Sequence, residues 1–262
     1  MLSTLIKKWR GKRPSIFILS GAGLSVESGI PTYRGAGSDA NNNSQSLTKG
    51  DMRSVPEKVF VETNRRIRDF DACKPNQAHF AIAHFVKTYR LKADIIHVTQ
   101  NIDSLCEEAG DTAVFHLHGS LNQSRCQKCG ATFPRKGFYK MGNQCPKCKA
   151  KFSHVRPDVV LFGETPHGLG WILPYLEEVD IFIAVGTSGT VYPAADFVRM
   201  ATSFGTPIRI FVNKEKPIDS EFSFPMQEDI NLSFNVVRLG DATKILPLVL
   251  KEVGKLINNI PQ

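Results

Sequence analysis

The chain has 262 residues, 42% hydrophobic and 22% charged, and its 33 lysines and arginines against 25 aspartates and glutamates give a formal net charge of +8. Such a chain can bury a sizeable core, so wholesale disorder is excluded. Its longest apolar runs, such as IFIAV from Ile181, are far shorter than the roughly 20 residues that span a bilayer. Because the basic N-terminus also lacks a small-residue cleavage site, we expect no secretion signal and a cytoplasmic protein.

The positive charge is compatible with nucleic acid, an acidic peptide or a phosphate-bearing ligand. However, the lysines are scattered along the chain without an arginine and aromatic repeat, which argues against direct nucleic-acid binding. We therefore expect neither nucleic acid nor a membrane as a partner, while the composition leaves the oligomeric state open.

Short apolar runs and helical patterns alternate along the chain. The runs lack alternation of polar and apolar residues, which is typical of strands in a parallel sheet covered on both faces. Alternating strands and helices predict a doubly wound α/β fold, whose ligands bind at the carboxyl ends of the strands. The predicted strands are 16–20, 94–99, 158–162, 180–186, 208–213 and 234–239, and the predicted helices are 77–89, 193–204 and 242–257.

A glycine-rich turn follows the first predicted strand. Gly21 and Gly23 let the backbone come close to a ligand, and a helix that starts near Ser25 directs its N–H groups at a phosphate. The dinucleotide fingerprint G-x-G-x-x-G is not met, because Val26 occupies the place of its third glycine. The turn is therefore compatible with a phosphate site and equally with an ordinary tight turn.

Two segments interrupt the alternation of strands and helices. Residues 35–50 are rich in Gly, Asn and Ser and hold almost nothing that could anchor a core, so we predict a mobile loop. Residues 119–155 combine four cysteines with many Lys, Gly and Pro residues. This composition predicts a small module that is held together by a metal ion and inserted between strands of the sheet.

The four cysteines form two Cys-x-x-Cys pairs, Cys126 with Cys129 and Cys145 with Cys148, separated by 15 residues. Two such pairs at this spacing are typical of a tetrahedral zinc site. Four thiolates leave no open coordination position, so the zinc ion, one per chain, is predicted to be structural. The alternative, redox-active disulfides, is disfavoured in a protein that is not secreted.

Polar or small hydroxyl residues end two of the predicted strands, at the edge where a doubly wound sheet places its site. Their side chains suit hydrogen bonds to a phosphate or a ribose. The alternative is that they only cap the helices that follow. These residues are Gln100, Asn101 and Asp103 after strand 94–99, and Gly186, Thr187 and Ser188 at the end of strand 180–186.

Two histidines lie in the run VFHLHGS, where alternation places His116 and His118 on the same face. A histidine at the end of a strand can act as a general base near neutral pH. The alternative is a structural histidine, which is the commoner case for a histidine considered alone.

These motifs occur together and in an order that resembles the sirtuin family of NAD-dependent protein deacylases. The resemblance extends from about residue 14 to the C-terminus. It rests on GAGLSVESGIPTYRG, TQNIDSLCEEAG, HLHGS, the two Cys-x-x-Cys pairs, RPDVVLFGE, GTSGTVYPAA, IFVNKE and GDA.

The resemblance implies a large Rossmann-like domain and a smaller domain made of a zinc ribbon and a helical module. NAD and an acyl-lysine protein or peptide are expected to meet in the cleft between them. We expect the Rossmann-like domain at 1–34, 75–120 and 156–262, the loop and helical module at 35–74 and the zinc-binding module at 121–155.

The resemblance also implies roles for individual residues, with His118 as the general base. The expected NAD contacts are Gly21, Ala22, Gly23, Tyr33, Arg34, Gln100, Asn101, Ile102, Asp103, Gly186, Thr187, Ser188, Asn213, Lys214, Glu215 and Ala242. A substrate peptide is expected to add as a strand to RPDVVLFGE. The expected contacts in that segment are Val160, Phe162, Gly163 and Glu164.

In the implied reaction, the acyl oxygen attacks C1′ of the nicotinamide ribose, nicotinamide leaves, and His118 takes a proton from a ribose hydroxyl. The products are nicotinamide, O-acyl-ADP-ribose and free lysine, and zinc takes no part. Residues 35–50 are expected to close over NAD, with Tyr33 shielding the reactive face. The alternative on the same scaffold is NAD hydrolysis or mono-ADP-ribosyl transfer, in which water or a protein side chain intercepts the ribose.

One segment departs from the pattern of sirtuins that remove succinyl or malonyl groups. Those relatives carry a Tyr and an Arg three residues apart on one helix. This chain has Arg65 and Arg66, but Glu62 and Thr63 stand where the tyrosine is expected. Although Thr32 resembles the subgroup with Thr in this motif, we therefore expect no preference for acidic acyl groups, which Glu62 repels.

Overall fold

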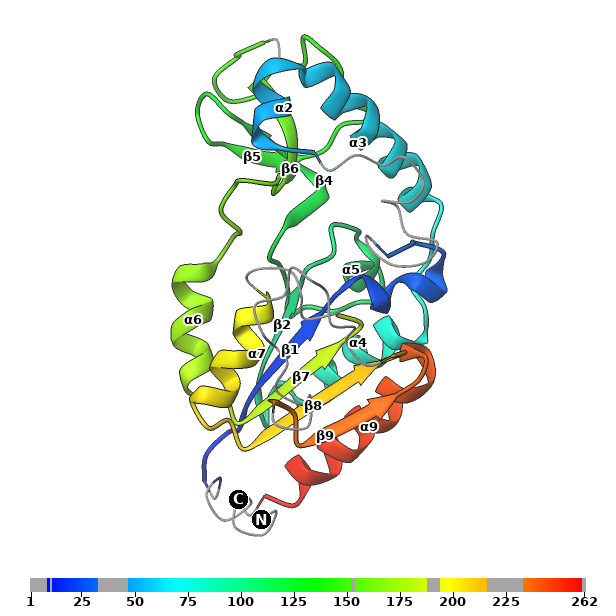
Figure 1. Ribbon diagram of the computed structural model, residues 1–262, viewed down its shortest axis with the longest axis vertical. Coiled ribbons are helices and arrows are strands. Elements are labelled where there is room, and N and C mark those ends of the chain that lie inside the picture. Colours follow the sequence, from blue (N-terminus) through cyan, green and yellow to red (C-terminus); the bar gives the residue numbers. More distant parts are fainter. Residues whose placement is uncertain are drawn as a thin grey trace.

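The computed structural model describes residues 9, 11–32, 47–151, 154–187, 194–215 and 233–260. These residues form a larger unit built on a parallel sheet and a smaller unit beyond the carboxyl ends of the strands of that sheet (Figure 1). The strands of the larger unit are β1 (Ser15–Ser20), β2 (Asp94–Thr99), β3 (Val114–His116), β7 (Ile181–Val185), β8 (Ile208–Asn213) and β9 (Val236–Leu239). Its helices are α4 (Gln77–Tyr89), α5 (Leu105–Glu108), α6 (Leu169–Glu177), α7 (Ala194–Ser203) and α9 (Ala242–Asn258).

The described strands of this sheet lie in the order β3-β2-β1-β7-β8-β9, and all neighbours are parallel. The chain builds outward from β1 in one direction, returns to it and builds outward in the other, as in Rossmann sheets. The order reverses between β1 and β7, which pair from Ile16 with Ile181 to Ser20 with Val185. The predicted doubly wound α/β fold is confirmed, and its ligand crevice is expected beyond the carboxyl ends of these two strands.

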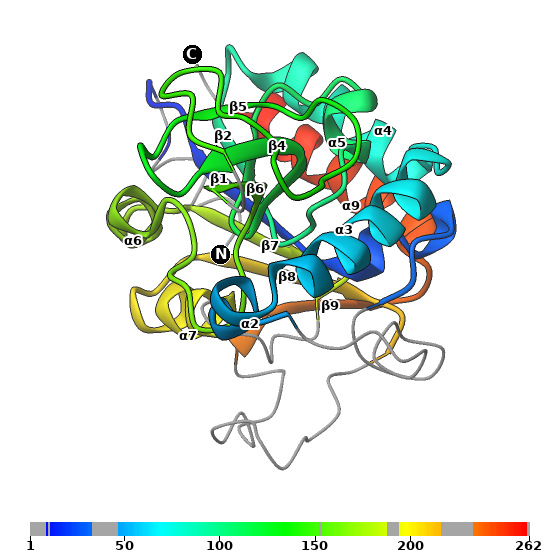
Figure 2. The same ribbon diagram turned by 90° about the horizontal axis from the view of Figure 1, so that it is seen from above.

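Helices cover both faces of the parallel sheet, which explains its continuous apolar strands. α4 and α9 cover one face, and α6 and α7 cover the other (Figures 1 and 2). Along β1, Ile16 and Ile18 belong to the first apolar layer, whereas Phe17 and Leu19 belong to the second. Successive residues of a strand point to opposite faces, so a strand between two apolar layers needs apolar side chains at every position.

The smaller unit combines an antiparallel sheet with two helices. Its elements are β4 (Gly119–Cys126), β5 (Thr132–Pro134), β6 (Val155–Val159), α2 (Lys49–Ser54) and α3 (Pro56–Asp71), with the strand order β5-β4-β6. Thr48 and Asp51 form a capping box that starts α2. Phe60 of α3 and Cys126 of β4 belong to one buried cluster, so the predicted helical module and the predicted zinc-binding module share a core.

One predicted strand belongs to a different sheet. Residues 158–162 were expected in the parallel sheet, but the strand found here is β6, which pairs antiparallel with β4. β3 occupies the sixth place in the parallel sheet instead. The physical reason is that β6 contains Arg156 and Pro157, a charge and a missing N–H donor that a doubly covered strand does not accommodate.

The helix predicted near Ser25 is replaced by two single 3-10 turns. These turns are η1 (Ala22–Leu24) and η2 (Val26–Ser28). Gly29 ends the second turn in the left-handed conformation, with φ of 97°, which glycine adopts without steric cost. Of the predicted loop at 35–50, only residues 47–50 are described, and the rest lies outside the described residues. At 47–50 the prediction is wrong, because Leu47 is buried in the core of the smaller unit and α2 begins at Lys49.

None of the described helices has both the length and the apolar character needed to cross a membrane.

Candidate active site

The carboxyl ends of the central strands face the smaller unit (Figure 1), and polar side chains at these ends are joined by hydrogen bonds. Gln100 follows β2, Thr187 follows β7 by two residues, and Asn213 ends β8. Gln100 Nε2 donates to Thr187 Oγ1 (2.9 Å), and Asn213 Nδ2 donates to the Thr187 carbonyl (3.3 Å). Amide and hydroxyl groups at the reversal of the strand order fit the ribose and phosphate groups of a dinucleotide.

The glycines after β1 pack directly against the turn after β7. A Cβ atom on Gly23 would lie 2.6 Å from Gly186 Cα, and one on Gly186 would lie 2.4 Å from the backbone nitrogen of Leu24. The N–H of Gly21 donates to the Val185 carbonyl (3.0 Å), and that of Gly23 donates to the Gly186 carbonyl (2.8 Å). Glycine is therefore needed here for contact between two backbone turns, and these two N–H groups join the turns.

Buried polar groups fix the loop after β2. Asn101 Nδ2 donates to the Gly21 carbonyl (3.2 Å) and to Ser25 Oγ (3.1 Å), and Ser25 donates to Asp103 Oδ2 (3.1 Å). Asp103 Oδ1 also accepts from the Leu105 N–H at the start of α5 (3.1 Å), so it serves that helix as well as the loop. Burial raises the pKa of Asp103, although the Leu105 and Ser25 bonds favour its ionised form.

His116 and His118 both face the loop after β2, as their alternation predicted. Nδ1 of His118 lies 3.0 Å from the Gln100 carbonyl oxygen, and Nδ1 of His116 lies 2.8 Å from that of Asn101. Because a carbonyl oxygen only accepts, both Nδ1 atoms carry a proton. In a neutral imidazole this leaves Nε2 of His118 with the lone pair that a general base needs.

The two histidines differ at their second nitrogen. His116 Nε2 is bonded to Glu107 Oε1 (2.8 Å); burial favours the neutral ring, but the Glu107 interaction outweighs it and raises the pKa of His116. Burial lowers the pKa of His118, and the Gln100 hydrogen bond opposes this only in part. His118 is therefore the histidine of this pair that is suited to take up a proton at neutral pH.

The other predicted NAD contacts lie in several different elements of the fold. Ala22 lies in η1, Lys214 and Glu215 are exposed after β8, and Ala242 is the buried first residue of α9. Ile102 turns toward a small cavity described below. Tyr33, Arg34 and Ser188 lie outside the described residues.

The four predicted metal ligands lie together. Their Sγ atoms are all within 4.8 Å of one another, with 3.7 Å between Cys126 and Cys148 and 3.8 Å between Cys129 and Cys145. A tetrahedral zinc ion with Zn–S bonds of about 2.3 Å requires sulfur atoms about 3.8 Å apart. The cluster therefore fits zinc, and its place in the core of the smaller unit fits a structural role.

The segment predicted to bind a peptide is partly engaged inside the protein. The Val160 N–H donates to the His118 carbonyl (2.8 Å). The Phe162 N–H donates to the Leu47 carbonyl (3.0 Å), and the Phe162 carbonyl accepts from the Lys49 N–H (2.9 Å). A peptide that adds as a strand at Phe162 would displace these bonds, whereas the half-exposed Phe162 ring is accessible to a ligand.

Glu164 forms an internal ion pair. Its two carboxylate oxygens accept from Arg156 at 2.7 and 2.8 Å, and Oε2 also accepts from the Leu161 N–H (3.0 Å). Burial alone would raise the pKa of Glu164, but the Leu161 and Arg156 bonds lower it. Gly163, with φ of +85°, turns the chain between them. The structure thus directs Glu164 toward Arg156, which is 2% exposed, rather than toward a peptide.

A cavity of about 50 Å³ lies between α3 and the segment after β6. It brings together Ile102, Val160 and Phe162 with Thr63 and Arg66 of α3. Its other lining residues are Leu47, Leu121, Pro157, Val159 and Leu161. Thr63 departs from the Tyr and Arg pattern of the relatives that remove succinyl or malonyl groups, whereas an Arg is present at 66, and the structure places both side chains in the wall of this cavity.

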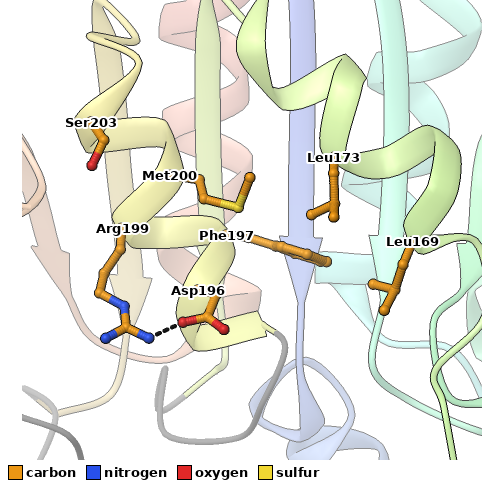
Figure 3. A pocket seen from close by; sticks show the side chains of 7 residues that line it. All are labelled: Leu169, Leu173, Asp196, Phe197, Arg199, Met200 and Ser203. Carbon is orange, nitrogen blue, oxygen red and sulfur yellow. Dashed lines mark hydrogen bonds and ion pairs between the residues drawn. The ribbon is translucent and has the colours of Figure 1, made fainter.

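A larger hollow of about 260 Å³ lies between α6 and α7 (Figure 3). Leu169, Leu173, Phe197 and Met200 line it, and Asp196 pairs with Arg199 at its rim. It shares none of the residues that the sequence analysis predicted for a site. Its wall is mostly apolar, and its carboxylate, Asp196, is engaged by Arg199.

A buried polar layer, which was not predicted from the sequence, lies beneath the site. His79 of α4 lies 3.3 Å from Ser25 Oγ, and His97 of β2 lies 2.6 Å from Asp111. One signal was present, since His97 interrupts an otherwise apolar strand. Its partner is 14 residues away along the chain and follows from the fold alone.

The strand order and the polar strand ends define a Rossmann-like dinucleotide-binding protein. Within that class, the model of the Sir2 family matches residues 21–193. The chain belongs to the Sir2 family, as the resemblance of its motifs predicted.

Known relatives extend this similarity over most of the chain. An NAD-dependent protein deacylase of Vibrio cholerae serotype O1 is 38% identical over 213 residues, which cover 79% of this chain and 85% of that protein. The ADP-ribose complex of a mutant Sir2 homologue aligns with a TM-score of 0.78 at 30% identity, covering 98% of this chain and 96% of the other. Sir2Af2 bound to a myristoylated histone peptide aligns with a TM-score of 0.66 at 27% identity, covering 98% and 99%.

Proposed function

We propose that the protein is an NAD-dependent protein-lysine deacylase that forms nicotinamide, O-acyl-ADP-ribose and free lysine. The observation that carries the proposal is the position of His118. Its ring is bonded to Gln100 at the dinucleotide site, and its carbonyl is bonded to Val160 in the wall of the small cavity. The deacylase relative and the neighbour with an acylated peptide support a protein or peptide with acyl-lysine as the substrate.

Bound NAD supplies an electrophilic ribose carbon that carries nicotinamide as its leaving group. Gln100, Asn101, Thr187 and Asn213 are the residues that we expect to hold it, because their polar groups converge at the reversal of the strand order. Internal hydrogen bonds already orient these side chains, so little reorganisation is needed when a ligand binds. The zinc ion holds the smaller unit together and contributes no chemistry.

His118 serves as the general base in this proposal. Its Nδ1–H is held by the Gln100 carbonyl, and Nε2 takes up the proton that a substrate hydroxyl releases. Because burial lowers the pKa of His118, the ring is neutral and basic at pH 7. The active form is deprotonated, so activity is lost as the pH falls through this pKa.

We further propose that the acyl group enters the small cavity and is short and neutral. Glu62 Oε1 accepts from Arg66 Nε (3.1 Å) and from Arg65 (2.8 Å). A carboxylate therefore already stands beside the cavity-lining guanidinium of Arg66, and an acidic acyl group would face its repulsion. The small volume of about 50 Å³ favours a short chain.

The test is nicotinamide release from NAD with peptides that carry acetyl-, propionyl-, butyryl-, succinyl- or myristoyl-lysine. We expect release that depends on the peptide and is strongest with the short neutral chains. His118→Ala is expected to lower kcat about 100- to 10,000-fold with an unchanged unfolding midpoint. His84→Ala, at an exposed position of α4, is the matched control and should leave kcat unchanged.

Each contrary outcome has a distinct meaning. Release without any acyl peptide would identify an NAD hydrolase, and label transferred from NAD to a protein would identify a mono-ADP-ribosyltransferase. No release with any peptide would overturn the proposed function. Near-normal turnover of His118→Ala would overturn the base assignment alone.

A further inference from the structure

A chain of buried hydrogen bonds runs beneath the candidate active site. His97 of β2 lies with Nδ1 2.6 Å from Asp111 Oδ2 and with Nε2 2.7 Å from Ser20 Oγ at the end of β1. Ser20 donates to Thr99 Oγ1 at the end of β2 (2.9 Å). The side chains of His97 and Asp111 are both 0% exposed. A histidine in the middle of an apolar strand is thus held at both of its nitrogens.

The donor and the acceptor of each of these buried hydrogen bonds can be assigned in turn. The Ser20 hydroxyl has one proton and donates it to Thr99, so Ser20 accepts from Nε2–H of His97. A second proton lies between His97 Nδ1 and Asp111, which makes the two side chains neutral as a unit. A neutral, fully hydrogen-bonded pair can be buried without an uncompensated charge.

The order Ser20, His97 and Asp111 has the connectivity of a hydrolytic triad but not its function. Ser20 is completely buried beneath the site, so its hydroxyl does not meet a substrate, as the nucleophile of such a triad must. The group therefore acts on its neighbours, and the neighbour at its open end is Thr99.

Thr99 leads directly to the general base. Its Oγ1 accepts from the Asn101 N–H (3.1 Å), while the Gln100 carbonyl accepts from His118 Nδ1 (3.0 Å). This N–H and this carbonyl belong to one peptide group, which is planar and turns only as a whole. The position of the Thr99 hydroxyl therefore determines where the carbonyl that orients His118 points.

We propose that His97 and Asp111 are positioning residues of the deacylase site, which act on His118 through Ser20, Thr99 and the peptide group defined above. The proposal rests on the function proposed for His118. A base imidazole needs its proton on Nδ1, and the partners that hold such a tautomer are worth about 10- to 100-fold in function where they have been removed from other histidine sites.

The other titratable side chains nearby do not account for the effect that we expect on His118. Burial lowers the pKa of His79 on α4 to about 4, with a smaller lowering by His97, so His79 is neutral at assay pH. Burial and nearby carboxylates raise the pKa of Cys106 on α5, so it stays a thiol. His167, in the segment after β6, faces His118 and is left intact in every variant below.

Two variants form a matched pair. In Asp111→Asn, Oδ1 can still accept from the Ala113 N–H, as Asp111 does at 2.8 Å, and the amide can donate to His97 Nδ1, so the chain to Thr99 is preserved. Adding His97→Leu removes the chain without leaving a buried charge unpaired. We expect kcat of the double variant to be about 10- to 100-fold lower than that of Asp111→Asn, because only the double variant lacks the hydrogen-bonded path to Thr99.

A second readout does not depend on turnover. Nitrogen NMR of the imidazole rings in the NAD-free protein reports the tautomer and pKa of His118. We expect the Nδ1–H form in the wild type and in Asp111→Asn, and a mixture in the double variant. Because the Gln100 bond raises the pKa of His118, its weakening lowers that pKa and moves the acidic limb of the pH–rate profile to lower pH.

The outcomes separate this inference from the proposed function. If the wild type releases no nicotinamide with any acyl peptide, the proposed function fails, and the NMR measurement still tests the positioning of His118. An unchanged His118 tautomer and kcat in a folded double variant would overturn the inference. If the double variant does not fold, Thr99→Val removes the acceptor of both the Ser20 hydroxyl and the Asn101 N–H, and an unchanged His118 tautomer in that variant would overturn the inference equally.

Discussion

The two units of the molecule are stabilised by different means. In the larger unit, Phe182 stacks on Phe17 at 5.6 Å and Phe197 meets the same ring at 6.1 Å, within apolar layers on both faces of the sheet. In the smaller unit, the described sheet has three strands, and the core includes Cys126 and Cys145 of the thiolate cluster. The larger unit thus depends on many apolar contacts, whereas the smaller one depends on one ion. Since His118 lies where the units meet, a loss in either one reaches the site.

Removal of zinc should produce the largest difference in stability between the two units. Structural zinc contributes about 10–16 kcal/mol of apparent binding free energy in small domains, more than the smaller core can replace. We expect a chelator to abolish activity and to expose the amides of β4 and β5 to hydrogen exchange, while those of β1 and β7 stay protected. Equal loss of protection in both units would show that they unfold together and contradict the comparison.

A substitution in the apolar core should destabilise the larger unit rather than the smaller one. Phe182→Ala removes a ring that is 0% exposed and is expected to lower the free energy of unfolding of the larger unit by about 3–5 kcal/mol. Phe138→Ala, at a ring of the smaller unit that is 51% exposed, is the control and should cost under about 1 kcal/mol. Denaturant unfolding followed with zinc bound measures both, and similar costs for the two variants would refute the prediction.

Glu164→Gln tests whether the smaller unit uses this residue for stability or for a substrate. The change removes the charge opposite the buried Arg156 guanidinium and should cost about 2–3 kcal/mol. The KM for an acyl peptide should remain unchanged. A higher KM with unchanged stability would assign Glu164 to the peptide instead.

The smallest effect concerns the pair of His116 and Glu107 at the edge of the larger unit. The pKa of His116 is raised in the folded state, so its contribution is present below its unfolded pKa of about 6.5 and is lost as the pH rises through the folded value. Glu107 is 44% exposed, so solvent limits the contribution to about 0.5–1 kcal/mol. The stability difference between the wild type and Glu107→Gln should therefore shrink from pH 6 to pH 8; a constant or growing difference would be contrary.

Local patterns sufficed where the controlling interactions are local. The helix predicted at 77–89 coincides with α4, because Asn76 caps it and its apolar residues recur at helical spacing. The runs 16–20 and 208–213 are strands of the parallel sheet, where apolar layers cover both of its faces. The two Cys-x-x-Cys pairs identified the thiolate cluster, since each pair brings two sulfur atoms to one point.

The remaining features depend on contacts between distant segments. Residues 158–162 were predicted as a strand of the parallel sheet, whereas β6 (Val155–Val159) pairs antiparallel with β4, a partner that the local pattern does not reveal. The pairing of Glu164 with Arg156, and of His97 with Asp111, appears only when turns bring these side chains together. Gly21 and Gly23 were predicted as ligand contacts, and that prediction stays open. Their close packing against Gly186 depends on the turn that follows a strand distant in the sequence.

Leu117 and His118 alone connect β3 of the larger unit with β4 of the smaller one. Gly119 follows with φ of +76°, and a Cβ atom there would lie 1.9 Å from the Asp158 carbonyl oxygen, so the start of β4 accepts only glycine at this position. Because the link has only two residues, one inserted residue would move the His118 ring away from Gln100 or the His118 carbonyl away from Val160. Surface loops commonly tolerate variation in length, but this link between β3 and β4 does not. Any tilt of one unit against the other is transmitted directly to His118.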